Sequence, residues 1–492
     1  MNCLRVPSEI RISQISAKAN SLSPANFGEI YLPNAVALKE LLTEAPIRGV
    51  TTPRIAFLRK APTSLITNKA LQSHSYFVNR HSSGVIPLSP RYFSNLGLKS
   101  GDILFSTNVN IGESAVVFEN NLSDLTINPW MVILRPQNQW YVFAFLKHQI
   151  TQDQMESFVP RGSIFRNAGG RYLNLMIPFP NQRDGERVIQ YVSALMQAIV
   201  EKEKVIRDKS DLIHDVIQAE LESNQRNREF QYIYPSIADL SSLQRFDAVI
   251  YDQEYKSKIW LVENYAHGSE TPQQAGFTVT PGPSLEIKII RTRIDSETYR
   301  PGYYTLILPT NISVCGTMNV LPYLGTPKSL PLLKQGDIVF GEAGFQKGRS
   351  IVLIDPWPKC TTNAHGLYAR RSDGDIQKAI FFRCIFSWYR TMRLIDIMAV
   401  GGSGGHFSPE YFDYVRIPRF PDDKQVEIAR LYHHDAAQPA GRPTLDSFMD
   451  WHNRWNTELG IWELDRGMKA LQRTLSEVQE QIIEGKTVNV PI

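Results

Sequence analysis

The sequence predicts an α+β protein with two similar domains, joined by two long helices that form an antiparallel coiled-coil spacer. Three observations predict this fold. The strand-like runs in 1–182 and 225–421 are short and separated by turn residues. Short motifs of the first region recur in the same order in the second. A helical segment follows each region, at 183–224 and 422–492, and carries a heptad-like apolar seam.

The segment 183–224 is predicted to form one long helix. It contains no proline, and its only glycine is Gly185. Apolar residues recur at alternating steps of four and three, with the stems of Lys202 and Lys209 filling two steps. This spacing favours a narrow seam over a broad globular stripe, in a helix about 60 Å long. The seam consists of Val188, Val192, Leu195, Ile199, Ile206, Ile213 and Val216.

A second seam lies in the C-terminal region. It consists of Leu464, Met468, Leu471, Leu475, Val478 and Ile482. We expect the two seams to pack against each other in antiparallel orientation. The alternative is an ordinary amphipathic helix on each domain, because three heptads are close to the minimum for a coiled coil.

A Gly-Asp turn that leads into an apolar strand is the clearest repeated motif. Residues 98–105 read LKSGDILF and residues 333–340 read LKQGDIVF, at an offset of 235. A small-residue loop and another apolar strand follow each copy, as in a hairpin of half-buried strands. We therefore expect two copies of one module, with mostly antiparallel strands.

Two weaker matches flank this motif. Ile-Tyr pairs occur at 30–31 and 250–251, at an offset of 220, and Ile-Pro pairs occur at 177–178 and 417–418, at an offset of 240. Offsets that vary this little predict one unit repeated with small insertions.

Helices are also expected within the modules, at 34–44 and 376–395. Linkers are expected at 224–236 and at 436–447, where Pro and Gly break the last helical region.

The composition is that of a globular protein. Of 492 residues, 42% are hydrophobic and 21% charged, and a formal charge of +4 is too small to identify a nucleic-acid partner. Four scattered cysteines indicate reduced thiols and a cytoplasmic location. The charged start of the chain does not fit a signal peptide, and apolar runs such as 140–146 have strand length, so no membrane association is expected.

Motifs of catalysis are missing from the sequence. We find no Asn/Asp-Pro-Pro-Tyr/Phe motif and no GxGxxG motif. Gly-Lys-Thr at 485–487 lacks the upstream glycine of a phosphate-binding loop, and the acidic pair in 252–254 fits a solvated turn. Cys360 and His365 supply only two of the ligands that a metal site needs. The histidines at 433–434 are expected to pack at a surface. We expect a non-catalytic chain without a metal or cofactor of its own.

These motifs, in this order and before long helices, resemble the specificity subunit of type I restriction-modification systems. The segment 245–248 (RFDA) is similar to the start of many of its domains, and the resemblance covers nearly the whole chain. It implies target-recognition domain 1 at 1–182, a central spacer helix at 183–224, target-recognition domain 2 at 225–421, and a C-terminal region at 422–492 that continues the spacer and binds partners.

The chain departs from the family pattern in its helical regions. The helices after the Ile-Pro pairs do not open with Glu-Gln, and an insertion at about 434–456 carries Trp451 and Trp455. These departures leave open a relative that serves a different defence system. The helix faces with Trp451, Trp455 and Trp462 are expected to bind the partner subunits.

The resemblance implies a sequence-specific DNA-binding subunit that recognises a bipartite, asymmetric target in double-stranded DNA. It would direct DNA adenine methyltransferase subunits, which carry S-adenosylmethionine, to that target, and a restriction nuclease or translocase subunit is a further partner that stays open. Two alternatives remain: a scaffold or inhibitory DNA-mimic-like component of a related phage-defence system, and a DNA-modifying enzyme with an unrecognised site.

Candidate DNA-binding residues lie in the loops after the Gly-Asp strands, in the glycine-rich loops before the Ile-Pro pairs, and in basic clusters. Asn, Gln and Arg read base edges, whereas Lys and Arg hold phosphates. For any one of them, ordinary surface polarity is the alternative. The candidates are Ser106, Thr107, Asn108, Asn110, Gln346, Lys347 and Arg349; Arg166, Asn167, Arg171, Ser403 and His406; and Arg80, His81, Arg291, Arg293, Arg370 and Arg371.

Overall fold

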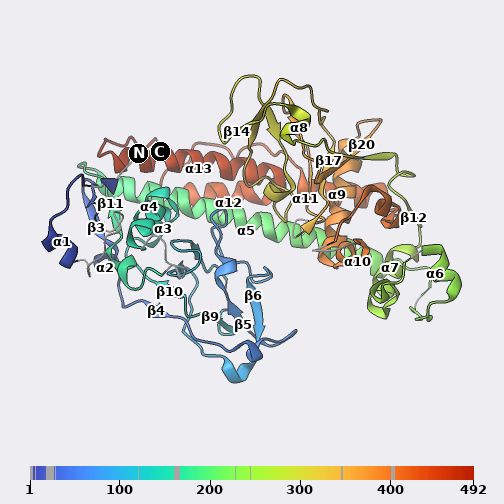
Figure 1. Cartoon of the computed structure of the whole chain (residues 1–492), viewed down its shortest axis with the longest axis horizontal. Coiled ribbons are helices and arrows are strands. Elements are labelled where there is room, and N and C mark those ends of the chain that lie inside the picture. The colour runs from blue at the N-terminus through green and yellow to red at the C-terminus, as the bar shows by residue number, and fades with distance from the viewer. Residues whose placement is uncertain are drawn as a thin grey trace. The chain divides into compact units, whose positions relative to one another are not determined.

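The computed structural model describes residues 4–5, 7–17, 27, 29–119, 121–159, 167–227, 229–243, 245–344, 347–400 and 405–491. Its contacts divide the chain into two units, and each is described by itself. Unit 1 consists of Met1–Lys204, Ala437–Thr457 and Arg466–Ile492, and unit 2 of Val205–Ala436 and Glu458–Asp465. The predicted α+β class is confirmed, with helices and short, mostly antiparallel strands in both units (Figure 1).

Unit 1 contains a four-stranded antiparallel sheet and a three-stranded sheet. The first has the order β4 (Ile47–Arg48), β10 (Met131–Leu134), β7 (Ile103–Ser106) and β8 (Ser114–Val116). The second has the order β6 (Val85–Leu88), β5 (Thr63–Ile66) and β9 (Leu125–Ile127), with β5 and β9 parallel. Two strand pairs complete it, β1 (Leu4–Arg5) with β2 (Glu29–Ile30) and β3 (Ala35–Ala37) with β11 (Met176–Pro178). Its short helices are α1 (Ile12–Ala17), α2 (Leu38–Leu41), α3 (Gln139–Lys147) and α4 (Gln149–Phe158).

Unit 2 repeats this arrangement. Its main sheet has the order β13 (Phe277–Pro281), β20 (Gly366–Arg371), β17 (Ile338–Gly341) and β18 (Ser350–Val352). Its second sheet has the order β14 (Ile294–Ser296), β16 (Tyr323–Gly325), β15 (Tyr304–Leu306) and β19 (Cys360–Thr361), with β15 and β19 parallel. β12 (Ser269–Glu270) pairs with β21 (Ile417–Pro418). Its helices are α6 (Ile237–Leu243), α7 (Gln253–Glu263), α8 (Ile287–Ile290), α9 (Ile376–Thr391), α10 (Leu394–Met398) and α11 (Asp422–Tyr432).

The Gly-Asp motif forms the same clamp in both units. Asp102 accepts hydrogen bonds from the backbone of Lys99 at 2.9 Å and from Arg135 at 2.6 and 2.7 Å. In unit 2, Asp337 accepts from the backbone of Lys334 at 2.7 Å and from Arg370 at 2.7 and 2.6 Å. Every partner lies 235 residues after its counterpart. The turn requires glycine before each Asp, because φ is +96° at Gly101 and +84° at Gly336.

The match between the Ile-Tyr pairs is wrong. Residues 29–30 form strand β2, whereas residues 248–251 form a turn of 3₁₀-helix before α7. The Ile-Tyr pair at 250–251 is therefore not the structural counterpart of the pair at 30–31. The structural counterparts are strands β3 and β12. Each pairs antiparallel with the Ile-Pro strand at the end of its own module.

The long helix is confirmed as α5 (Gly185–Ser223), one unbroken helix of 39 residues (Figure 1). Six predicted seam residues are buried on it: Val188, Val192, Leu195, Ile199, Ile206 and Ile213. The seventh is wrong, because Val216 is only half-buried and Ile217 is fully buried instead. An α-helix drifts by about 20° per heptad, so a straight helix shifts its buried stripe by one position over several heptads.

The buried face of α5 in unit 1 is wider than a two-helix seam. Tyr191, Met196 and Val200 are buried beside the predicted residues, in one core that also contains the apolar side chains of α3. The module thus packs directly on its own part of α5. The interpretation of a narrow seam is corrected, because one helix serves both the core of the unit and the contact with the C-terminal helix.

The C-terminal region forms α12 (Phe448–Glu458) and α13 (Ile461–Ile483). Within unit 1, α13 runs antiparallel to α5, since Gln182 exchanges two hydrogen bonds with the backbone of Val488 and Lys202 lies against Gly467. On α13, Met468 and Leu471 are half-buried, and the other seam residues are buried, namely Leu464, Leu475, Val478 and Ile482. Among the described helices, none has the length and apolar content of a membrane span.

Lys202 of α5 is almost completely buried in unit 1, with 1% of its surface exposed. Its ammonium donates to Oδ1 of Asn456 at 2.5 Å and lies 5.4 Å from the ring centre of Trp455. Burial lowers the pKa of Lys202 to about 8. This seam position therefore holds a buried lysine, and the ammonium of that lysine donates to a neutral amide.

Candidate nucleic-acid interface

In each module, the fold brings the two predicted loops together. The backbone N–H of Ala168 donates to Thr107 at 3.2 Å, and Asn108 bridges to Asn167. In unit 2, the N–H of Phe407 donates to Glu342 at 2.9 Å, and Ala343 bridges to His406. The loop after the Gly-Asp strand and the glycine-rich loop therefore form one surface in each module.

Three polar residues of the first loop are used inside the protein. Ser106 is fully buried and accepts from the amide of Asn68 at 2.5 Å. Thr107 donates to the carbonyl of Trp130, and Asn110 donates to the carbonyl of Asn68. The predictions of DNA contact for Ser106, Thr107 and Asn110 are corrected, because these groups hold the loop in place. Sequence polarity alone does not distinguish such a residue from one that faces a ligand.

The exposed part of the first interface lies around Asn167. This residue is exposed, and its Oδ1 caps the turn by accepting from Gly169 at 2.7 Å. Asn108 is half-buried, and its Oδ1 is buried without a hydrogen-bond partner in the part of the chain that the structure describes. Arg171 is exposed but donates to the carbonyl of Phe158 at 2.6 Å. Asn167 is thus an exposed candidate at the junction of the two loops of this module.

The second interface is more basic. His406 is exposed and lies 3.7 Å from Glu342. Lys347 is 9% exposed, with its ammonium 3.3 Å from Asp396. Arg349 is half-buried and donates to the carbonyl of Ile312 at 3.0 Å. Arg166, Gln346 and Ser403 lie outside the described residues.

Several basic candidates outside the loops are bound by acidic neighbours. Arg80 pairs with Glu119 and Asp124, Arg293 with Asp295, and Arg371 with Asp373. Arg370 is the clamp residue of Asp337, so its predicted contact with DNA is replaced by a structural role. His81 and Arg291 are exposed. Paired arginines bind a phosphate less readily, because a carboxylate already neutralises them.

The tryptophans expected to bind partners are mostly buried in their own units. Trp451 is 7% exposed and donates to the carbonyl of Gly441, and Trp462 is 6% exposed and donates to Asp355. Trp455 is half-buried. Trp451 thus holds the inserted segment and Trp462 contacts the segment after β18, so the predicted role of these two residues in partner binding is not supported by their burial.

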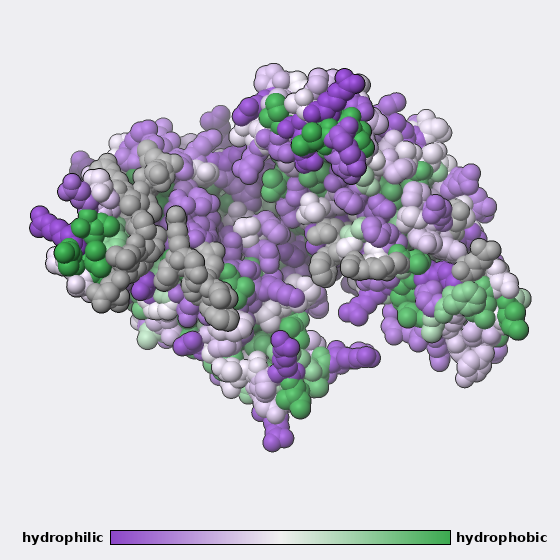
Figure 2. Space-filling view, in the orientation of Figure 1, coloured by the Kyte–Doolittle hydropathy of each residue, from purple (hydrophilic) through white to green (hydrophobic). Residues whose placement is uncertain are grey.

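Apolar surface is instead found near α6. Figure 2 shows a hydrophobic patch over this helix. Its exposed residues are Ile233, Tyr234, Ile237, Phe246 and Val249.

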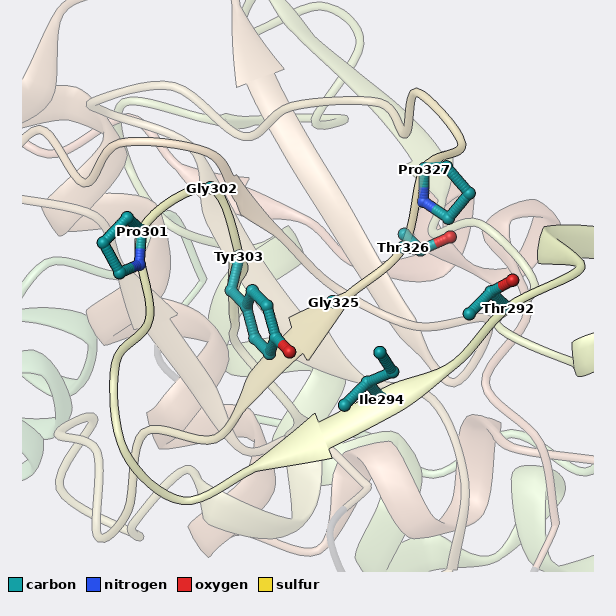
Figure 3. A pocket seen from close by; sticks show the side chains of 8 residues that line it. All are labelled: Thr292, Ile294, Pro301, Gly302, Tyr303, Gly325, Thr326 and Pro327. Atoms are coloured by element: carbon teal, nitrogen blue, oxygen red, sulfur yellow. The ribbon is translucent and has the colours of Figure 1, made fainter.

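A cavity of unit 2 lies between β14 and β16 and has a volume of about 280 Å³. Figure 3 shows the ring of Tyr303 beside Gly325, where a side chain would meet the ring at 2.6 Å. The lining residues are threonine, proline, glycine, isoleucine and tyrosine, so the cavity has no charged group for a phosphate or a metal. Within the described ranges, no group of His, Cys, Asp and Glu is placed to hold a metal ion.

Comparisons with known proteins give structural likenesses only. No protein-family model and no curated protein matches the chain. It is similar to the S subunit of a type I restriction-modification system from M. genitalium, with 12% identity and a TM-score of 0.38 over 93% of this chain and 96% of that one. It is also similar to the HsdS subunit from Thermoanaerobacter tengcongensis, with 13% identity and a TM-score of 0.27 over 92% and 97%. A third similar chain belongs to a structure of complex assembly and conformational transition of the type I R-M system, with 12% identity and a TM-score of 0.29 over 93% and 100%. Because these TM-scores are low, we base the functional proposal on the geometry of the two modules.

Proposed function

We propose that this chain is the DNA-recognition subunit of a type I restriction-modification system or of a related defence system. The observation that carries the proposal is the repeated pair of loops, which the same Asp–Arg clamp and the same main-chain bridges hold in both units. Two equivalent modules that present different residues suit a target with two different half-sites. Asn167 in one module and His406 in the other illustrate the difference.

The chain is proposed to read DNA without performing chemistry on it. The loops present amide, imidazole and basic groups, which bind base edges and phosphates. Catalysis is assigned to DNA adenine methyltransferase subunits, which flip the target base and carry S-adenosylmethionine. The modules correspond to 1–182 and 225–421, with 183–224 and 422–492 as spacer and partner-binding helices.

The test is co-expression with a DNA adenine methyltransferase subunit from the same genome, followed by single-molecule sequencing of host DNA for N6-methyladenine. One asymmetric, gapped motif methylated throughout the genome is expected. Asn167→Ala should reduce the base specificity at one half-site, and His406→Ala should reduce it at the other, because each residue belongs to a different module. A control variant, Arg59→Gln, should leave the motif unchanged, since this exposed arginine lies outside the candidate loops and basic clusters. A complex that forms without methylating any motif would instead indicate a scaffold or inhibitor.

A further inference from the structure

Beside one buried cation, one pair of equivalent positions carries side chains of opposite charge in the two modules. In unit 1, the ammonium of Lys147 donates to the carbonyl of Ser114 and lies 3.8 Å from the carboxylate of Glu113. In unit 2, Nε of Arg383 donates to the carbonyl of Ser350 at 3.2 Å. Both residues of this contact lie 236 positions after their counterparts, so Arg383 takes the place of Lys147.

The acidic partner is not repeated. Glu113 precedes Ser114, and the residue that precedes Ser350 is Arg349. The first module therefore balances its buried cation with a carboxylate of its own, whereas the second has a second cation at the equivalent position. A buried charge that lacks a counter-charge is costly unless a ligand supplies one.

A third arginine joins this group from the end of α9. A Cβ atom at Gly348 would lie 3.3 Å from Cβ and Cδ of Arg390, so the Arg390 stem passes directly beside the loop that carries Arg349. Burial, and next the charge of Arg390, lowers the pKa of Arg349. Nε of Arg349 is buried without a hydrogen-bond partner among the described residues. We call Arg349, Arg383 and Arg390 the arginine cluster.

Two neighbouring groups bear on the charge of the arginine cluster. His214 donates to or accepts from Ser387 at 3.0 Å, and burial followed by Arg383 and Arg390 lowers its pKa to about 4, so its imidazole is neutral. Burial lowers the pKa of Arg390, and the negative charge of Asp396 opposes this shift. Asp396 also pairs with Lys347 at 3.3 Å. Arg390 thus shares the carboxylate of Asp396 with Lys347, and the carboxylate of Asp465 lies on the side of Tyr432, whose ring Arg383 contacts.

We propose that a phosphate group binds between Arg349 and Arg390 and supplies the negative charge that Glu113 supplies in the first module. Guanidinium groups hold phosphate through paired N–H donors, and both side chains are half-buried, so they are reachable from the surface. Arg383, which is 1% exposed, adds charge from behind. This inference rests on the proposed function, under which the phosphate belongs to the DNA backbone beside the second module.

The experiment uses the full chain and the variant Arg390→Gln. The control is Arg430→Gln, which removes an exposed arginine from α11. Thermal unfolding is measured in sodium phosphate and in sodium chloride of equal ionic strength. Phosphate should raise the melting temperature of the parent and of Arg430→Gln by a few degrees and should leave Arg390→Gln unchanged. In chloride, Arg390→Gln should melt about 2–4 °C above the parent, since it relieves repulsion between like charges.

The second measurement distinguishes a phosphate of the DNA backbone from a free phosphate. Binding to a duplex of about 30 base pairs that carries the methylated motif is measured from 50 to 200 mM salt. For a backbone phosphate, Arg390→Gln lowers the slope of log K against log salt by about one, and Arg430→Gln does not. Phosphate protection with an unchanged slope supports a site for a free phosphate, even if the chain does not bind DNA. Loss of stability on Arg390→Gln in chloride, or equal phosphate protection of all three proteins, would overturn the proposal while leaving DNA recognition intact.

Discussion

Replacing Lys202 by methionine should stabilise unit 1 near neutral pH. Burial lowers the pKa of Lys202 from 10.5 to about 8. At about 1.36 kcal/mol per pKa unit, keeping this ammonium charged in the folded state costs about 3 kcal/mol. Methionine removes this cost but leaves Oδ1 of Asn456 without its donor, which costs about 1–2 kcal/mol. We expect a net gain of about 1–2 kcal/mol in the free energy of unfolding.

The pH dependence is the sharper part of this prediction. Between about pH 8 and 10.5, the folded state has released the Lys202 proton and the unfolded state still holds it, so stability rises with pH. The parent should therefore recover about 3 kcal/mol relative to Lys202→Met over this range. Below pH 8 the difference should be constant, because the lysine is then charged in both states.

The assay is guanidinium unfolding of the full chain, followed by circular dichroism at half-unit steps from pH 7 to 10.5. Lys147→Met is the matched control, because the pKa of this lysine is also lowered to about 8. Its ammonium, however, donates to the carbonyls of Gln72, Ser75 and Ser114. Lys147→Met should destabilise by about 1–2 kcal/mol, since three acceptors that lose their donor cost about 4–5 kcal/mol and removal of the buried charge recovers about 3 kcal/mol. A difference between the parent and Lys202→Met that does not change with pH would refute the reasoning.

Three further outcomes are expected. Arg370→Gln should lower the free energy of unfolding by about 3 kcal/mol, because it leaves Asp337 buried without its partner, and should not alter the salt slope of DNA binding. Gly336→Ala should cost about 1–2 kcal/mol in the same unfolding assay, since its φ of +84° strains a residue with a Cβ. Glu463→Gln should cost about 1 kcal/mol near pH 6. His433, whose pKa the Glu463 hydrogen bond raises, contributes fully below pH 6.5, so this cost should shrink as the pH rises through the folded pKa of His433; a cost that grows instead would contradict this assignment.

The periodic and repeated features of the sequence predicted the fold well. The long helix and the Gly-Asp hairpins depend on local rules, namely heptad spacing and a positive φ at glycine. The run 140–146 was expected to have strand length but lies in the buried helix α3, because an apolar run without polar alternation does not distinguish the two.

The candidate interface was less predictable than the fold. The fold brings the predicted loops together, but the side chains of Ser106 and Asn110 point inward. The arginine cluster was missed because Arg383 and Arg390 lie on α9, more than 30 residues after Arg349. A comparison of aligned modules could have found it, since the charge at Glu113 and Arg349 is reversed and Arg390 corresponds to the neutral Gln154.

Under the proposed function, the Asp–Arg clamps have a consequence for how new target specificities can evolve. Asp102 with Arg135, and Asp337 with Arg370, fix the base of each hairpin through the turn that precedes its strand. The exposed residues, such as Asn167 and His406, take no part in these clamps. Point mutations at the tips can therefore accumulate without passing through unstable intermediates. The architecture separates the residues that natural selection must keep from those that it can vary.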